Sequence, residues 1–228
     1  MTALVAQSRK LLLWCVLIVG VAGCGGFGQP KTEGHAKLWV TRDRGTHVLL
    51  VRDVPAGLTA LQALGREADV ETRYGGRYVQ AINGVEGSIS ARRDWFYFVN
   101  GVEADRSAAE YQLRPGDVEW WDYRSWAKRM RVPVVVGAFP EPFLHDVQPT
   151  WIVAAPRYLV LARHLAKLTG GQAGRRAPPG ANVIRIVGER QFRAHLGNRG
   201  EVRAQLGVTT ARRLVRDPAA VRFRYEVP

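Results

Sequence analysis

The sequence predicts an α+β protein, with one mixed sheet and a single helix in its first half and a small basic α/β domain in its second half. Three observations predict this class. Short apolar stretches with the spacing of strands run through residues 36–126, and one stretch has helical spacing. Asn-Gly and Pro-Gly pairs separate these stretches, as turn residues do. The charge balance then changes abruptly near residue 127.

The change in charge predicts a domain boundary between residues 126 and 127. Residues 36–126 hold 12 basic and 13 acidic residues, a net charge of −1, whereas residues 127–228 hold 18 and 6, a net charge of +12. The basic half suits anionic lipid headgroups or an acidic partner, and equally a solvated Arg-rich surface. We expect no nucleic-acid partner, because an exported protein rarely meets one.

The first domain is expected to begin with two strands around a turn at Asp43–Gly45. Leu58, Leu61 and Leu64 recur at a spacing of three in GLTALQALGREA, with Thr59 near the start, and predict a short amphipathic helix. Tyr78–Ile82 is the next expected strand. It ends at Asn83-Gly84, a pair that favours a type I′ hairpin because both positions need positive φ.

The same pattern returns in WFYFVNGVEA, where a strand over residues 95–99 ends at Asn100-Gly101. Pro115-Gly116 then turns the chain into a last strand, Val118–Tyr123. Two strands, one helix and several further strands make the order of a β-grasp domain, one mixed sheet curled over one helix.

Both faces of this sheet are expected to be apolar or aromatic. Residues 94–126 hold four of the seven tryptophans and three of the seven tyrosines. Trp120 and Trp121 are adjacent, and neighbours on a strand point to opposite faces. A short helix covers only one face, so the other needs the C-terminal domain, a ligand or a partner, or else stays exposed.

The N-terminus predicts export. Arg9 and Lys10 precede the apolar run at residues 11–23, which is shorter than the ~20 residues of a membrane-spanning helix. The run ends in VAGC, which resembles the bacterial lipobox and implies a signal peptide over residues 1–23 and lipid on Cys24. We therefore expect a Gly-rich tether over residues 24–35 and a chain anchored on the extracytoplasmic face of the cell membrane.

The second domain, residues 127–228, is expected to combine strands and helices. VPVVVGAFPEPF predicts a buried strand, RYLVLARHLAKLTGG a helix stopped by two glycines, and NVIRIVG a strand. ERQFRAHLG is interpreted as a short helix. AVRFRYEVP alternates apolar and charged residues, which predicts a last strand with one wet face.

Residue types suited to chemistry are sparse, so we expect no enzyme, no metal site and no required cofactor. The five histidines stand singly, and the acidic residues Glu103, Asp105 and Glu110 lack calcium-loop spacing. Asp117 and Asp122 flank the Trp pair, but Asp117 follows Pro-Gly as a turn residue.

Aromatic surface beside glycine-containing loops indicates a binding site instead. The glycines of the loop RYGGRY allow its backbone to approach a ligand closely. The alternative interpretation is a turn that leads into a strand, with its tyrosines at the edge of the sheet. We expect the rings of the last strand to lie near this loop, at one rim of the sheet. The candidate ligand-binding residues are Tyr74, Gly75, Gly76, Tyr78, Trp121, Tyr123 and Trp126.

The motifs GLTALQAL, GGRYVQAINGVEG and WFYFVNGVEADRSAAEYQLRPGDVEWWDY resemble the family of the domain of unknown function DUF4430 over residues 36–126. That family is similar to the C-terminal domain of transcobalamin and intrinsic factor. The resemblance implies a β-grasp-like fold and a corrinoid ligand such as cobalamin, or a similar vitamin, captured for a membrane transporter. The relatives add a helical domain that this sequence lacks. The alternative is a cell-surface protein-interaction module without a small-molecule ligand.

Overall fold

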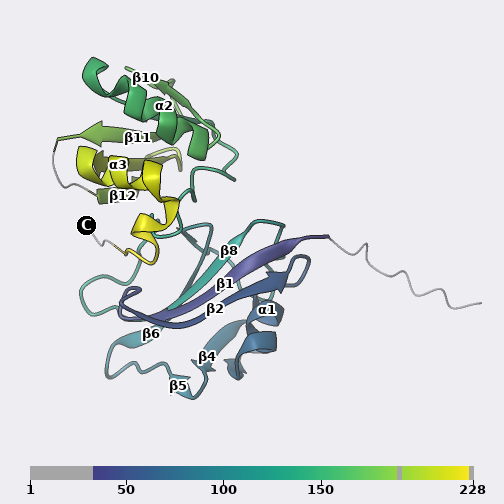
Figure 1. The fold of residues 1–228 in the computed structure, drawn as a ribbon. Helices are drawn as coiled ribbons and strands as arrows, with labels where there is room; N and C mark the ends of the chain where they lie inside the picture. Colours follow the sequence, from purple (N-terminus) through teal and green to yellow (C-terminus); the bar gives the residue numbers. More distant parts are fainter. Residues whose placement is uncertain (1–32, 189–191, 226–228) are drawn as a thin grey trace, which may run out of the picture. The chain divides into compact units, whose positions relative to one another are not determined.

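The fold is α+β, as predicted, and it contains two five-stranded sheets and one small sheet among the described residues (Figure 1). The computed structural model describes residues 33–188 and 192–225. The predicted signal peptide, Cys24 and most of the predicted tether therefore lie outside the described residues. No helix within the described ranges is long and apolar enough to cross a membrane.

The first sheet is mixed, because β1 and β8 run parallel while its other neighbours are antiparallel. Its order is β2-β1-β8-β6-β7. The strands are β1 His35–Arg42, β2 His47–Pro55, β6 Arg93–Val99, β7 Val102–Glu103 and β8 Val118–Ser125. A separate three-stranded sheet consists of β3 Val70–Arg73, β4 Tyr78–Ile82 and β5 Val85–Glu86.

One helix packs on the first sheet, as the leucine spacing predicts. Helix α1, Ala60–Glu67, begins with a capping box in which Thr59 and Gln62 bond each other's backbone N–H groups. Ala63 and Leu64 are fully buried in the core that α1 shares with Leu38. Local capping and an apolar stripe together fix this helix.

Both Asn-Gly turns are confirmed. The backbone φ angles are 49° at Asn83 and 72° at Gly84, and 51° at Asn100 and 74° at Gly101. These pairs of positive values are what a type I′ turn requires. A Cβ at Gly101 would also lie 2.5 Å from the carbonyl oxygen of Val135, so this turn has no room for a side chain.

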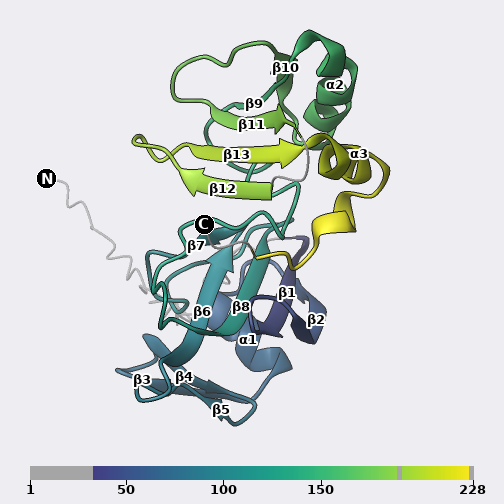
Figure 2. The ribbon, with the colours of Figure 1, turned by 90° about the vertical axis from the view of Figure 1, so that its left-hand side faces the viewer.

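The second sheet is parallel except for one edge strand, β12 (Figure 2). Its order is β10-β9-β11-β13-β12. The strands are β9 Thr150–Val153, β10 Gln172–Gly174, β11 Asn182–Val187, β12 Phe192–Leu196 and β13 Val202–Gly207. The helices are η1 Pro156–Tyr158, α2 Leu159–Leu168, α3 Val208–Arg216 and η2 Pro218–Val221. The expected helix at residues 159–168 and strand at residues 182–187 are confirmed.

Three expectations for the second half were wrong. ERQFRAHLG holds strand β12 in its described part, because the hairpin with β13 supplies backbone partners and Ala194 alternates with exposed neighbours. VPVVVGAFPEPF is buried but forms only one bridge, since its three prolines lack N–H donors. Residues 222–225 are no strand either, because the N–H of Phe223 bonds to the carbonyl of Gly137.

The described residues belong to one compact unit of the chain. The predicted division between residues 126 and 127 falls just after β8 and stays a prediction. Helix α3 and strands β9, β10 and β13 had no counterpart in the sequence analysis.

Candidate functional site

The second aromatic face of the first sheet is covered by the chain itself. Trp39, Phe98 and Trp120 are buried on this face beside the segment at residues 132–138. Tyr225 packs on this face, with its ring centroid 5.3 Å from the ring centroid of Phe98 and 5.5 Å from that of Trp120. Of the three covers considered from the sequence, the C-terminal part of the chain is the one that packs on this face among the described residues.

The opposite face, which packs on α1, holds Trp121 and Tyr123 of the predicted site. Both side chains are buried in the core that lies between this sheet and α1. Trp121 stacks on Tyr97 with ring centroids 4.8 Å apart and planes 19° apart. Tyr123 donates its hydroxyl hydrogen bond to the carbonyl of Glu86 at 3.0 Å and packs on Trp95. Both are packing residues of this core, and Trp121 also lines a hollow.

Beside this stack lies a fully buried carboxyl group, Glu119. It accepts a 2.5 Å hydrogen bond from Nε1 of Trp121, and its Oε2 has no partner among the described residues. Loss of water on burial raises the pKa of Glu119 to about 8, and the Trp121 bond offsets only part of that rise. The carboxyl is therefore mostly protonated in the folded protein at neutral pH.

The loop residues of the predicted site lie at the surface beside β4. Tyr74 is 79% exposed, with its ring 6.2 Å from that of Tyr78. The hydroxyl of Tyr78 donates to Asp94 at 2.6 Å, and burial together with that carboxylate raises the pKa of Tyr78 well above its usual value. Tyr78 is thus held in one orientation as a neutral phenol.

The structure brings together part of the predicted site. Gly76, Tyr78 and Trp121 line one hollow of about 300 Å³, together with Tyr97 and residues 104–108. Tyr74 and Tyr78 line a second hollow of about 500 Å³ with Asp94. The residues that line neither of these two hollows are Gly75, Tyr123 and Trp126.

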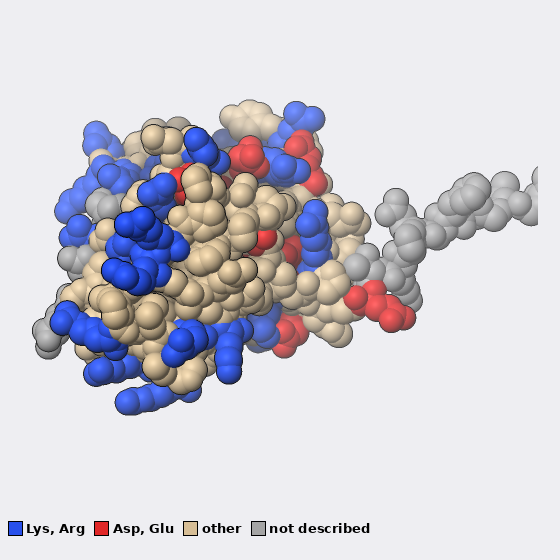
Figure 3. Space-filling view, turned by 90° about the horizontal axis from the view of Figure 1, so that it is seen from above, with Lys and Arg blue, Asp and Glu red and all other residues tan. Residues whose placement is uncertain are grey.

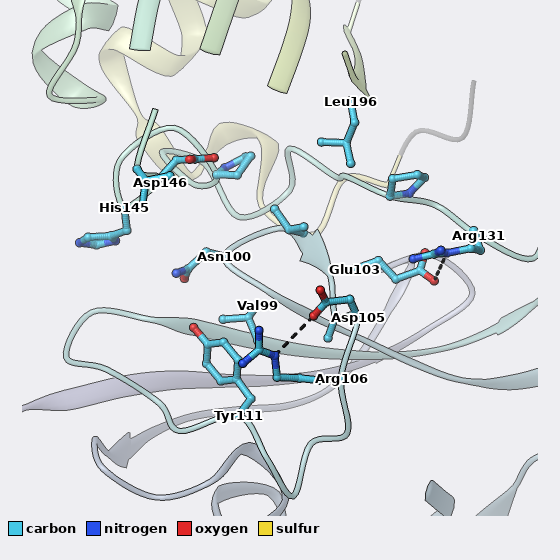
Figure 4. A pocket seen from close by; sticks show the side chains of 15 residues that line it. Val99, Asn100, Glu103, Asp105, Arg106, Tyr111, Arg131, His145, Asp146 and Leu196 are labelled. Atoms are coloured by element: carbon cyan, nitrogen blue, oxygen red, sulfur yellow. Dashed lines mark hydrogen bonds and ion pairs between the residues drawn. The ribbon is translucent and has the colours of Figure 1, made fainter. Parts of the chain in front are cut away.

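A third pocket, of about 440 Å³, is lined by both apolar and charged side chains (Figure 4). Strands β6 and β7 and their turn contribute one part of the lining, and the segment at residues 131–147 contributes another. Leu196 at the end of β12 also lines the pocket. The apolar lining residues are Val99, Val102, Ala104, Pro133, Pro142, Val147 and Leu196.

The lining of this pocket carries both signs of charge. Glu103 pairs with Arg131 at 3.8 Å, and Asp105 pairs with Arg106 at 3.4 Å, as the dashed lines in Figure 4 mark. Asp146 and His145 also line the pocket. The Asp105–Arg106 pair is exposed and gains little from its own attraction, so its charged ends are available to a ligand at low cost. Glu103 is largely buried and also accepts a hydrogen bond from the N–H of Val132.

Hydrogen bonds to neighbouring carboxylates fix three polar side chains of the pocket lining, Asn100, Tyr111 and His145. Asn100 donates a 2.7 Å bond to Asp117 and Tyr111 donates a 3.2 Å bond to the same carboxylate. Burial and Asp117 raise the pKa of Tyr111 to about 12, so its hydroxyl stays protonated. His145 is bound by Glu141, with Nδ1 2.5 Å from Oε1. Asp117 and Glu141 therefore hold the polar side chains of the lining in place before a ligand binds.

Arg106 lines this pocket, the hollow that contains Gly76 and Trp121, and a further hollow at residues 110–114. Its backbone carbonyl accepts the hydroxyl of Tyr97 at 2.5 Å, which fixes the loop. The ridge at residues 104–106 therefore separates two hollows that one extended ligand can contact together. In the sequence, Glu103 and Asp105 stand out only as acidic residues without calcium-loop spacing, and no motif there points to Arg106.

The lining of this pocket includes neither Ser, Thr nor Cys, and the described residues contain no cluster of three metal-ligating side chains. The arrangement suits reversible binding. The absence of enzymatic activity stays a prediction.

The comparisons with known proteins bear on the first half of the chain. Residues 57–125 match the family model described as a domain of unknown function (DUF4430). No curated protein matches the sequence.

Two crystal structures show a weak likeness. The first is a protein from Ruminococcus gnavus ATCC 29149, suggested by its description to bind metal, at 17% identity and a TM-score of 0.34. The match covers 41% of this chain and 98% of that one. The second is haptocorrin in complex with Cbi, at 19% identity and a TM-score of 0.34, covering 46% of this chain and 28% of that one. The family match at residues 57–125 confirms that this part of the chain resembles DUF4430, as its motifs predict.

Proposed function

We propose that this protein binds a flat, partly apolar small molecule in the pocket between β6–β7 and the segment at residues 131–147. The main support for this proposal is that apolar side chains line the pocket together with charged side chains of both signs around Arg106. A pocket of about 440 Å³ lies in the usual range for small-molecule sites. Polar groups held in place beforehand reduce the ordering cost of binding.

A corrinoid such as cobalamin is the ligand we propose, as the family resemblance implies. A corrin ring is flat and apolar at its faces and is bordered by amide side chains, which both donate and accept hydrogen bonds. The apolar part of the lining suits the ring, and a charged part with Arg106, Arg131, Glu103 and Asp105 supplies partners for both ends of an amide. A whole corrinoid is larger than this pocket, so we place its remainder across the ridge at residues 104–106.

We further propose that the chain is exported, lipid-anchored through Cys24 on the extracytoplasmic face, and delivers its ligand to a membrane transporter. The basis is the basic start, apolar run and VAGC of the N-terminus. We expect Cys24→Ala to release the protein from the membrane fraction, because one acyl-modified residue would carry the anchor. An equally firm membrane association of the variant in fractionated cells would contradict the anchor.

We expect Arg106→Ala to weaken corrinoid binding roughly tenfold, or about 1.4 kcal/mol, because a charged hydrogen-bond donor is lost from the shared ridge. Titration of tryptophan fluorescence with cobalamin and cobinamide, corrected for ligand absorbance, measures it. Arg66→Ala is the matched control, since Arg66 is exposed in the last turn of α1 and lines none of the pockets described above.

A wild-type protein that gives no saturable signal up to high-micromolar corrinoid would overturn the ligand assignment. Equal corrinoid affinities of wild type and Arg106→Ala would show that the ligand does not bind at the ridge formed by residues 104–106. Trp121→Ala is a poor probe of binding, because Trp121 is buried and its loss disturbs the core.

One observation favours the alternative, a protein-interaction module. Strand β2 is an edge of the first sheet and exposes Val48, Leu49 and Val51 to between 42% and 49%. An edge strand of nine residues with apolar side chains is a template for adding a partner strand. This function becomes the preferred one if corrinoids do not bind.

A further inference from the structure

Helices α2 and α3 lie side by side on one face of the second sheet (Figures 1 and 2). Ala162 and Leu165 of α2 and Ala211 and Leu214 of α3 are buried in one core with Ile184 of β11. The outer faces of both helices are therefore turned away from the sheet.

The two outer faces carry the same pattern. On α2 the exposed positions at spacings of three, four and seven are Val160, Arg163, His164 and Lys167. On α3 they are Thr209, Arg212, Arg213 and Arg216. We call these eight residues the cationic helix face. Its five Lys and Arg side chains have no ion pair among the described residues.

Acidic residues do not neutralise this face. From residue 150 to residue 225 the acidic residues described are Glu201 and Asp217. Glu201 is buried and bound to Arg203. Asp217 is exposed directly after α3 and forms no ion pair among the described residues, so it offsets at most one of the five cations. Seen from above, Lys and Arg side chains dominate the charged surface of this part of the molecule (Figure 3).

We propose that the cationic helix face docks on the surface of an anionic lipid bilayer. Guanidinium groups bind phosphate oxygens in pairs, and two adjacent helices present them in a broad layer. Val160 is 59% exposed within this layer, which suits the boundary between headgroups and acyl chains. Among its eight residues, this face has no Phe, Tyr or Trp side chain and a single imidazole, at His164, on which a nucleic-acid base would stack.

The test compares two variants with the same change in net charge. Arg212→Gln/Arg213→Gln removes two cations from the cationic helix face. Arg185→Gln/Arg193→Gln removes two exposed cations from β11 and β12, at positions that alternate with the buried Ile184 and Ala194 and so lie on the other face of the sheet. Gln keeps helix propensity close to that of Arg, and circular dichroism checks that both variants fold.

Binding of the full chain is measured by sedimentation with vesicles of phosphatidylcholine alone and of phosphatidylcholine with phosphatidylglycerol. The neutral vesicles record any contribution of the apolar run at residues 11–23, which is common to all variants. We expect wild type to prefer anionic vesicles. We expect the affinity of the helix variant for anionic vesicles to fall roughly fivefold per cation, about 25-fold in all. The affinity of the sheet variant should fall much less.

Salt gives a second readout, because about 1 M salt shortens the Debye length to about 3 Å and should abolish the preference. Equal losses in both variants would show that net charge alone is responsible and would overturn the proposal. So would a wild type without preference for anionic vesicles. Duplex DNA that binds more tightly than vesicles, and loses affinity with Arg212→Gln/Arg213→Gln, would identify a nucleic acid as the partner instead.

Discussion

Arg124→Ala is expected to lower the free energy of unfolding by roughly 3–5 kcal/mol, the largest loss of stability we expect of a single substitution here. Arg124 is fully buried on β8. Its Nε donates to the hydroxyl of Tyr225 at 2.9 Å, and its Nη atoms donate to the carbonyls of Arg129 at 3.1 Å and Met130 at 2.6 Å. The guanidinium also lies 3.6 Å from the ring centroid of Phe96.

The size of the effect follows from what Arg124 holds together. It binds both the segment after β8 and the C-terminal residues that cover the aromatic face. Alanine leaves two carbonyls and one hydroxyl without their donor and leaves a cavity beneath Phe96. Because Tyr225 also packs on Trp120, its release gives water access to that indole.

Urea denaturation followed by tryptophan fluorescence measures the loss, and the emission of the folded variant should shift to the red. Tyr225→Phe is the graded control: it removes one hydroxyl acceptor and should cost about 1 kcal/mol. It also keeps the experiment informative if Arg124→Ala does not fold. A loss below about 1 kcal/mol for Arg124→Ala would show that the cover does not depend on this residue.

Glu119→Gln is expected to stabilise the protein by roughly 3 kcal/mol near pH 7 and by more above pH 8, and to have little effect near pH 4.5. The pKa of Glu119 is raised from 4.5 to about 8 in the folded protein by burial. Between these values the unfolded chain has lost the proton and the folded chain keeps it. The contribution of Glu119 to the free energy of unfolding therefore falls by about 1.4 kcal/mol per pH unit as the pH rises from 4.5 to about 8. This contribution is highest below pH 4.5.

Glutamine copies the protonated carboxyl, since its amide oxygen can accept the bond from Trp121 and it carries no charge at any pH. The free energy of unfolding of both proteins is measured in urea from pH 4.5 to pH 9. Glu71→Gln, at an exposed position on β3, is the matched control and should not change the profile. A constant difference between wild type and Glu119→Gln over this range would contradict a shifted pKa at Glu119.

Much of the first domain was determined by local sequence. Asn83-Gly84 and Asn100-Gly101 fold as predicted because positive φ is a property of these residue types and needs no distant partner. The helix at α1 follows from its leucine spacing and the cap at Thr59. The alternation of Trp120 and Trp121 correctly assigned them to opposite faces, because a strand has a period of two.

The second half was predicted less well because its sheet is parallel. Neighbouring strands there, such as β9, β11 and β13, are joined through long connections, and short apolar runs do not reveal which partner they will find. The prediction of a helix at β12 was wrong because this edge strand forms through its hairpin with β13, and its own residues do not indicate a strand.

The sequence by itself determined that both faces of the first sheet are apolar and that the basic charge lies in the second half. Only the tertiary structure decided what covers those faces and where a ligand finds space. Phe223 and Tyr225 are about a hundred residues from Trp120, yet they close its face, because burial of aromatic surface is independent of distance along the chain. Arg106 became a candidate only where segments from β6, residues 131–147 and β12 meet around one pocket.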